Sequence, residues 1–186
     1  MSGFDLSKIE TTLNRVKGFN NKVAQVGIPK GPTYPSDRGG QPVAFVAAIQ
    51  EFGAPEASIP ARPFIIPAVN KDKSAWASYI GSGVVKVIRN QTTADDVLYK
   101  VGSKAQLSIQ ESIKNIYEPA LSPITVLLRK WRKEGETITG KTVGKAARDI
   151  DSGVDAGSDD KPLIDDGILL SSINHAVNKK GSEFTV

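Results

Sequence analysis

The chain has 186 residues, of which 39% are apolar and 24% charged, and its 24 basic side chains give a net charge of only +4 against 20 acidic ones. This composition predicts one soluble domain over 1–186 and provides too little positive charge to indicate a dedicated nucleic-acid binder. With no cysteine and one histidine, His175, disulfides and most catalytic constellations are excluded, so we expect no enzyme, no catalytic or metal residue and no cofactor.

Apolar residues that recur every three or four positions predict helices along much of the chain. In chain order these helices cover 5–17, 42–53, 70–90, 94–117 and 122–133. In the helix over 42–53, one face carries Phe45, Ile49 and Phe52. In the helix over 70–90, every fourth residue from Trp76 to Ile88 is apolar, and Gly81 and Gly83 weaken the helix.

Strands are predicted where β-favouring residues lie between turn signals. The first covers 23–28, and two more, 172–178 and 182–186, are expected to pair through a Lys-Lys-Gly turn. Between the helices and the last strands, 134–160 is poor in apolar residues and is expected to form a long flexible loop. The pattern predicts an α+β fold, with amphipathic helices packed on one face of a small antiparallel sheet.

The segment "IPARPFIIPA" contains three prolines and therefore predicts a stiff extended arm, placed at 54–67. Its apolar side chains Phe64, Ile65 and Ile66 need cover, so the arm either folds back over its own sheet or inserts into a neighbouring subunit. As a hypothesis, Phe64 and Ile65 anchor the arm and Arg62 ties it to an acidic group such as Glu51.

Three short motifs can each be interpreted either as a functional site or as an ordinary structural element. "GETITGKT", Gly135 to Thr142, matches a phosphate-binding loop, but a charged helical run precedes it where a buried strand is required. "RKWRK", with Arg129, Trp131 and Arg132, could grip a nucleic acid, or could be a helix end with its tryptophan buried. "DIDSGVDAGSDD", 149–160, lacks the ligand pattern of a calcium loop, and a solvated acidic loop is favoured.

Two longer runs resemble the signature of a family of small tail-component and virion-morphogenesis proteins of long-tailed bacteriophages. They are "VAFVAAIQEFGAPEASIPARPFIIPAV", 43–69, and "KPLIDDGILLSSINHAV", 161–177. In that family an "A..hEfG" helix precedes "IPARPFLrPA" and a long helix, and a "kPLidTGqLrnSi" motif closes the chain. Asp166 and Ile168 depart from the common Thr and Gln, and the insert 134–160 is long.

The resemblance implies a structural protein of the neck or tail-completion complex, which joins head and tail as one subunit of an oligomeric ring. Its partners would be copies of itself, the head connector or head-closure protein, and the tail terminator or tail tube, with packaged DNA close by and no membrane. It would be located in the virion at the top of the tail, and in the host cytoplasm during assembly. The alternatives are a tail terminator that caps the tail tube, and a nucleotide-binding protein that uses Gly135 to Thr142. The hypothetical subunit contacts are Glu51, Arg62, Phe64, Ile65, Ile66, Arg129, Trp131 and Arg132.

Overall fold

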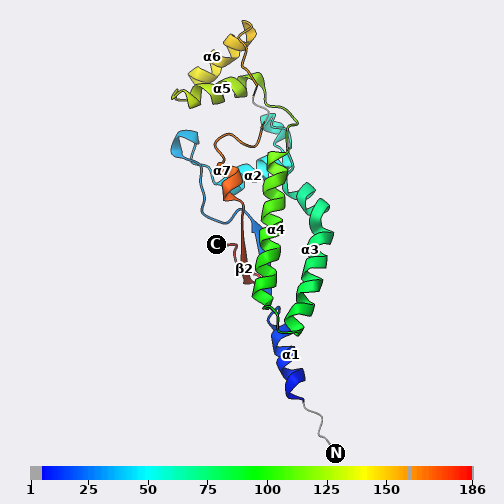
Figure 1. The fold of residues 1–186 in the computed structure, drawn as a ribbon. Helices are drawn as coiled ribbons and strands as arrows, with labels where there is room; N and C mark the ends of the chain where they lie inside the picture. Colours follow the sequence, from blue (N-terminus) through cyan, green and yellow to red (C-terminus); the bar gives the residue numbers. More distant parts are fainter. Residues whose placement is uncertain (1–5, 159–160, 186) are drawn as a thin grey trace, which may run out of the picture. The chain divides into compact units, whose positions relative to one another are not determined.

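A computed structural model describes residues 6–158 and 161–185. Within these ranges the chain forms seven α-helices and one sheet of two antiparallel strands, which confirms the predicted α+β class (Figure 1). None of the described helices is long and apolar enough to cross a membrane. The elements are α1 Ser7–Lys17, β1 Lys22–Gly27, α2 Val43–Phe52, α3 Ile65–Ile88, α4 Ala94–Lys114, α5 Pro123–Lys133, α6 Gly140–Asp151, α7 Ile168–Ser172 and β2 Asn174–Lys179, with short 3-10 turns at Ser36–Arg38 and Pro55–Ala57.

The chain divides into two compact units, each assembled from separate stretches of sequence. The first unit comprises 1–30, 65–112 and 172–186, and the second comprises 31–64 and 113–171. We describe each unit by itself. The expectation of one domain over 1–186 stays a prediction.

The sheet of the first unit joins segments far apart in the sequence. Strands β1 and β2 pair antiparallel from Lys22 opposite Lys179 to Gly27 opposite Asn174. One face of the sheet packs on α4, because the His175 ring lies against the Tyr99 ring with centroids 4.6 Å apart. A Cβ at Gly102 would lie 3.0 Å from the His175 ring, tighter than an ordinary contact, so the ring would have to shift slightly.

The long helices α3 and α4 of the first unit lie side by side (Figure 1) and cross closely at Gly83. A Cβ at Gly83 would lie 2.5 Å from a methyl group of Val97, so only glycine permits this approach. The predicted stripe of α3 is wrong at its end, where Val87 is buried and Ile88 is 43% exposed. Residues four apart are separated by about 400° of helical rotation, so a stripe of fours drifts about 40° per step away from a fixed face.

Helices α5 and α6 of the second unit form a hairpin, and α6 lies inside the segment expected to be a flexible loop (Figure 1). The Thr139 hydroxyl accepts the Thr142 N–H and the Thr142 hydroxyl accepts the Thr139 N–H, which caps α6 at its start. Ala146 and Ile150 of α6 pack toward α5, whereas Val143 is exposed. The shared core consists of Val126, Leu127, Ala146 and Ala156, with Leu121, Ile124, Leu128, Trp131 and Ile150 packed around it.

Two other expectations are corrected by the structure. The extended arm is shorter than 54–67, because 55–57 form a turn and α3 already begins at Ile65. Pro67 fits in the first turn of α3, where backbone N–H groups have no partner within the helix. The described part of 182–186, residues 182–185, forms no strand, and β2 pairs with β1 instead. The predicted helix over 122–133 is confirmed as α5, which begins at Pro123 with the Ser122 side chain as its cap.

Candidate functional site

The proline segment is held inside the second unit by two buried charged residues, Arg62 and Glu51. The Arg62 guanidinium donates from Nε to the Pro119 carbonyl at 2.7 Å and from Nη2 to the Ala120 carbonyl at 3.1 Å. The Glu51 carboxylate accepts the backbone N–H of Phe64 at 2.7 Å. Both residues thus fix the same segment through separate hydrogen bonds, and the expected tie between Arg62 and Glu51 stays a prediction. Burial, followed by the nearby Arg129, lowers the pKa of Arg62.

The apolar residues of this segment differ in their access to a partner. Phe64 is fully buried within the chain, so it cannot be the anchor that inserts into a neighbouring subunit. Ile65 is partly buried and Ile66 is 49% exposed, at the start of α3. Of the three apolar residues assigned to subunit contact, Ile66 is thus the most available.

The basic end of α5 is mostly committed to contacts within the second unit. Arg129 donates from Nη2 to the Pro162 carbonyl at 2.7 Å and from Nη1 to the Lys161 carbonyl at 3.2 Å. Arg132 pairs with Asp165. Trp131 packs against the hairpin core, and Lys145 of α6 lies 4.5 Å from its ring centroid. This arrangement favours the structural interpretation of "RKWRK", with its tryptophan on the buried side.

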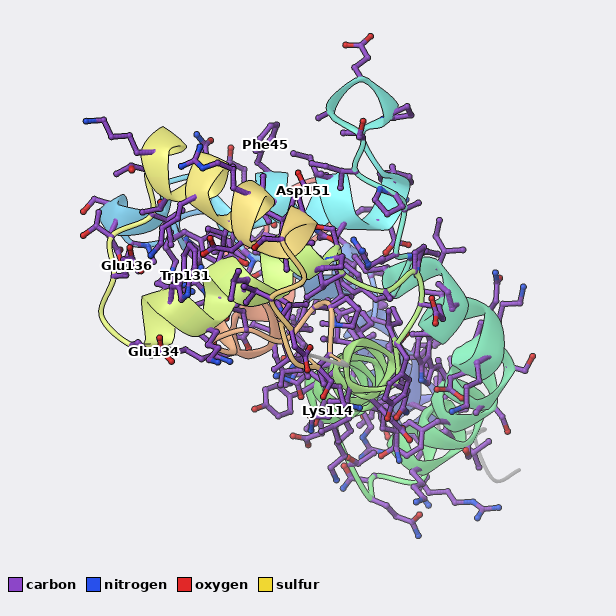
Figure 2. All side chains as sticks on the ribbon, turned by 90° about the horizontal axis from the view of Figure 1, so that it is seen from above. Phe45, Lys114, Trp131, Glu134, Glu136 and Asp151 are labelled. Atoms are coloured by element: carbon purple, nitrogen blue, oxygen red, sulfur yellow. The ribbon has the colours of Figure 1, made fainter. Side chains whose placement is uncertain are left out.

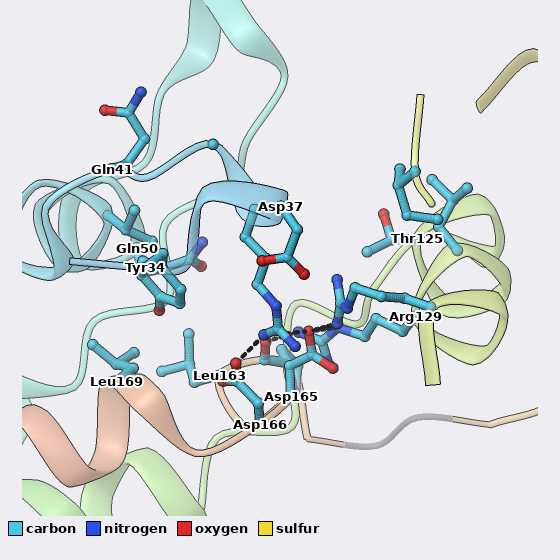
Figure 3. A pocket seen from close by; sticks show the side chains of 17 residues that line it. Tyr34, Asp37, Gln41, Gln50, Thr125, Arg129, Leu163, Asp165, Asp166 and Leu169 are labelled. Carbon is cyan, nitrogen blue, oxygen red and sulfur yellow. Dashed lines mark hydrogen bonds and ion pairs between the residues drawn. The ribbon is translucent and has the colours of Figure 1, made fainter. Parts of the chain in front are cut away.

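Arg129 and Arg132 line an open cavity of about 570 Å³ in the second unit (Figure 3). Its polar side is a cluster of three arginines, Arg38, Arg129 and Arg132, around Asp165 and Asp166. Arg38 pairs with Asp166, and its Nη1 lies 3.7 Å from Asp165. The remaining walls are provided by Tyr34, Asp37, Gly39, Gln41, Val46, Gln50, Thr125, Leu128, Ile138, Pro162, Leu163 and Leu169.

The charges of this cluster change the protonation equilibria of its members. Burial lowers the pKa of Arg132, and the neighbouring Arg38 and Arg129 lower it further. Burial and the negative charge of Asp166 raise the pKa of Tyr34. Arginine stays protonated across the physiological range even so. The cluster is therefore suited to holding segments of the chain together and to binding polar groups, and not to proton transfer.

Three atoms of the cluster are buried and have no hydrogen-bond partner among the described residues. They are Nε of Arg38, Nε of Arg132 and Oδ1 of Asp165. A buried polar atom without a partner costs about 1–3 kcal/mol relative to a satisfied one. The cluster thus joins the loop before α2, helix α5 and the segment before α7 at some cost in stability.

Helix α2 presents an unusual surface, because it buries a charged residue and exposes aromatic ones. Its inner face carries Val43, Ala47 and Glu51. Its outer face carries Phe45, which is 54% exposed, Phe52, which is 71% exposed, and the partly buried Ile49 between them. Figure 2 shows the Phe45 ring pointing away from the ribbon. The apolar face predicted from the sequence is present in α2, and its aromatic side chains are exposed on the surface.

The other motifs form no site within the described residues. In "GETITGKT", Gly140 opens helix α6, but helix α5 precedes the motif and the Thr142 hydroxyl is used in the helix cap. No described group of His, Asp or Glu side chains could hold a metal ion, and the last two positions of 149–160 lie outside the described residues. His175 lies in the first unit, where its ring packs on α4 and pairs with Gln106.

The sequence indicated some of these residues and missed others. Arg129 and Arg132 were singled out for their charge, and Asp165 and Asp166 lie in the second of the two family-like runs. Arg38 and Tyr34 lie in a Gly/Pro-rich loop and carried no signal, because only the folded chain brings that loop to α5. Asp166, which stands where the resembled family commonly has Thr, forms an ion pair with Arg38.

Comparisons with known proteins give no relative for this chain. No family model matches the sequence, and no curated protein and no solved structure matches it at a significant level.

Proposed function

We propose that the protein is a structural subunit of a bacteriophage neck or tail-completion ring. The observation that carries the proposal is the outward apolar face of α2, formed by Phe45, Ile49 and Phe52. Contiguous exposed apolar surface commonly marks a protein–protein interface. A ring closes when the same surface of every subunit fits a complementary surface on the next copy.

The arrangement of the family-like runs in the second unit also supports this role. Val46 and Gln50 of the first run and Leu163, Asp165 and Asp166 of the second line the same cavity. Parts of two runs separated by nearly half the chain therefore line one cavity. Arg62 and Glu51 fix the proline segment through their hydrogen bonds. Because Glu51 belongs to α2, this also keeps α2 next to that segment.

The oligomeric state of the purified full chain tests the proposal, alone and after coexpression with the products of its neighbouring genes. We expect a closed oligomer by native mass spectrometry. Substituting Phe45→Lys and Phe52→Lys should weaken the assembly about tenfold or more for each aromatic lost from the interface. Both side chains are exposed in the isolated chain, so the thermal melting of the subunit should not change.

Leu107→Lys on α4 is the matched control, because Leu107 is 62% exposed and lies outside the family-like runs. It should leave the oligomer intact. A wild-type chain that stays monomeric under every condition would contradict the proposal, and so would an oligomer that survives both α2 substitutions.

The tail terminator remains the second candidate, and imaging of particles separates it from the neck ring. A neck subunit lies at the head-to-tail junction, and its loss leaves filled heads without tails. A terminator is found on tail tubes that have not yet met a head.

A further inference from the structure

A small cavity of about 150 Å³ lies between α3 and α4 in the first unit, far in sequence from the arginine cluster. Tyr79, Ser82, Gly83 and Lys86 of α3 form one wall, Val97 and Lys100 of α4 form the other, and Gln91 and Thr92 of the turn close one side. No carboxylate lines it. The two lysines give the lining a net charge of +2, unlike the cavity of the second unit, which mixes three arginines with three aspartates.

Several donors that surround this cavity are not used in ion pairs or side-chain hydrogen bonds with described residues. Neither Lys86 nor Lys100 has an ion pair or side-chain hydrogen bond to another described residue, and the same is true of the Gln91 amide and the Tyr79 hydroxyl. Ammonium, amide and hydroxyl groups all donate hydrogen bonds, so they can converge on one acceptor group.

The charges near the cavity also favour an acceptor group that is negatively charged. Lys104 lies over the Tyr79 ring, 5.1 Å from its centroid, and adds a third cation. Asp96 is one helical turn before Lys100, and its carboxylate accepts from the hydroxyl and the N–H of Thr93. These bonds lower its pKa, and the nearby charge of Lys100 adds a smaller lowering. Asp95 pairs with Lys22 at 2.6 Å. Both acids of this turn therefore have partners of their own.

The base of the cavity is rigid, because Gly83 and Val97 are in direct contact at the helix crossing. Donors placed on two packed helices keep their positions better than donors on a loop. The size of the cavity limits the ligand further. Pockets for drug-sized ligands span about 300–1,000 Å³, so this one admits a single compact group and excludes a whole nucleotide.

We propose that the cavity between α3 and α4 binds one phosphate group through Lys86 and Lys100, with Gln91 and Tyr79 as neutral donors. The phosphate belongs either to free inorganic phosphate or to a nucleic-acid backbone. The inference is independent of the proposed ring, since it uses only contacts within the first unit.

Two probes and three variants of the full chain test the inference. The probes are inorganic phosphate, followed through the amide NMR signals of Gly83 and Gln91, and a 20-base-pair DNA duplex, followed by fluorescence anisotropy at several salt concentrations. Lys86→Gln and Lys100→Gln should each weaken phosphate binding roughly tenfold, because each removes a charge-assisted hydrogen bond. With the duplex, each should reduce the slope of log affinity against log salt by about 0.9.

Lys73→Gln is the control, because Lys73 is exposed on the same helix, outside the cavity, and loses the same charge. An effect of Lys86→Gln and Lys100→Gln on both probes, with none for Lys73→Gln, supports a site for backbone phosphates. An effect on inorganic phosphate alone supports a site for the free ion. Equal effects of all three variants, or phosphate that leaves the Gly83 and Gln91 signals unmoved, would overturn the inference.

Discussion

The two units of the molecule are stabilised in different ways. The first relies on long helices whose apolar residues pack along their length, with the buried stripe of α4 running through Val97, Val101 and Ile109. The second uses shorter helices and contains Arg62 and Glu51, the two buried charged residues of the described chain. Apolar packing tolerates small shifts, whereas a buried charge needs each partner in place. The second unit therefore depends more on individual contacts.

The two tryptophans allow this comparison to be measured, because Trp76 belongs to the first unit and Trp131 to the second. Replacing either tryptophan with phenylalanine leaves one tryptophan, whose fluorescence reports the unfolding of the unit that contains it. Denaturant curves of the two single-tryptophan proteins would show whether the units unfold together or in separate transitions.

The largest expected effect is the loss of Phe64 from the second unit. Phe64→Ala should lower the free energy of unfolding by about 3–5 kcal/mol, since the side chain is fully buried. Urea denaturation followed at Trp131 measures it. Phe52→Ala, which trims a 71% exposed ring, should stay within about 0.5 kcal/mol of the wild type. Equal costs for the two changes would contradict the assignment of Phe64 to the interior and Phe52 to the surface.

A smaller effect, with opposite signs at two glycines, tests the packing of the first unit. Gly83→Ala should destabilise by about 1–2 kcal/mol, because a Cβ 2.5 Å from Val97 forces the helices apart by more than the helix gains from alanine. Gly81→Ala meets no atom within 4 Å and should stabilise by about 0.5–1 kcal/mol. Thermal melting followed at Trp76 distinguishes them, and a stabilising Gly83→Ala would refute the close crossing.

The smallest effect is a pH dependence confined to the first unit. Burial lowers the pKa of His175 below its ordinary value of 6.5, so the unfolded chain binds the proton first. The stability from neutral His175 is complete above about pH 6.5 and falls as the pH drops toward the folded pKa. Urea curves at pH 7.5 and 5.5, read at Trp76, should differ more for the wild type than for His175→Gln. An identical pH difference in both proteins would exclude this origin, because the chain has no other histidine.

The sequence predicted those parts of the fold that depend on local pattern. The helices over 94–117 and 122–133 and the first strand all follow from neighbours along the chain, and the structure confirms them as α4, α5 and β1. Helix α6 was missed because its apolar face consists of small or isolated residues, and its cap uses threonine where glutamate is usual. The partner of β2 was also missed, since pairing within a hairpin is the local choice and the real partner lies near the other end of the chain.

For the candidate site, the sequence indicated the charged residues but not their geometry. Arg62 and Glu51 were singled out for the proline segment, and their hydrogen-bond partners are mainly backbone groups, with the Gln50 side chain 3.5 Å from Arg62 Nη1. Backbone partners leave no trace in side-chain patterns. The outward direction of Phe45 and Phe52 could not be derived from periodicity, because an apolar stripe shows that a face is distinct without showing what covers it.

The pairing of β1 with β2 has a consequence for synthesis. Strand β1 leaves the ribosome early, but its hydrogen-bonding partner follows only after almost all of the described chain. Until then the edge of β1 has no partner in the sheet, and α4 lacks the surface that His175 supplies. Closing so long a loop is slow compared with forming a helix. Translation of truncated mRNAs that stop before codon 174 should therefore yield chains that form α3 and α4 but remain prone to degradation. The α5–α6 hairpin, in contrast, can fold as soon as it has emerged from the ribosome.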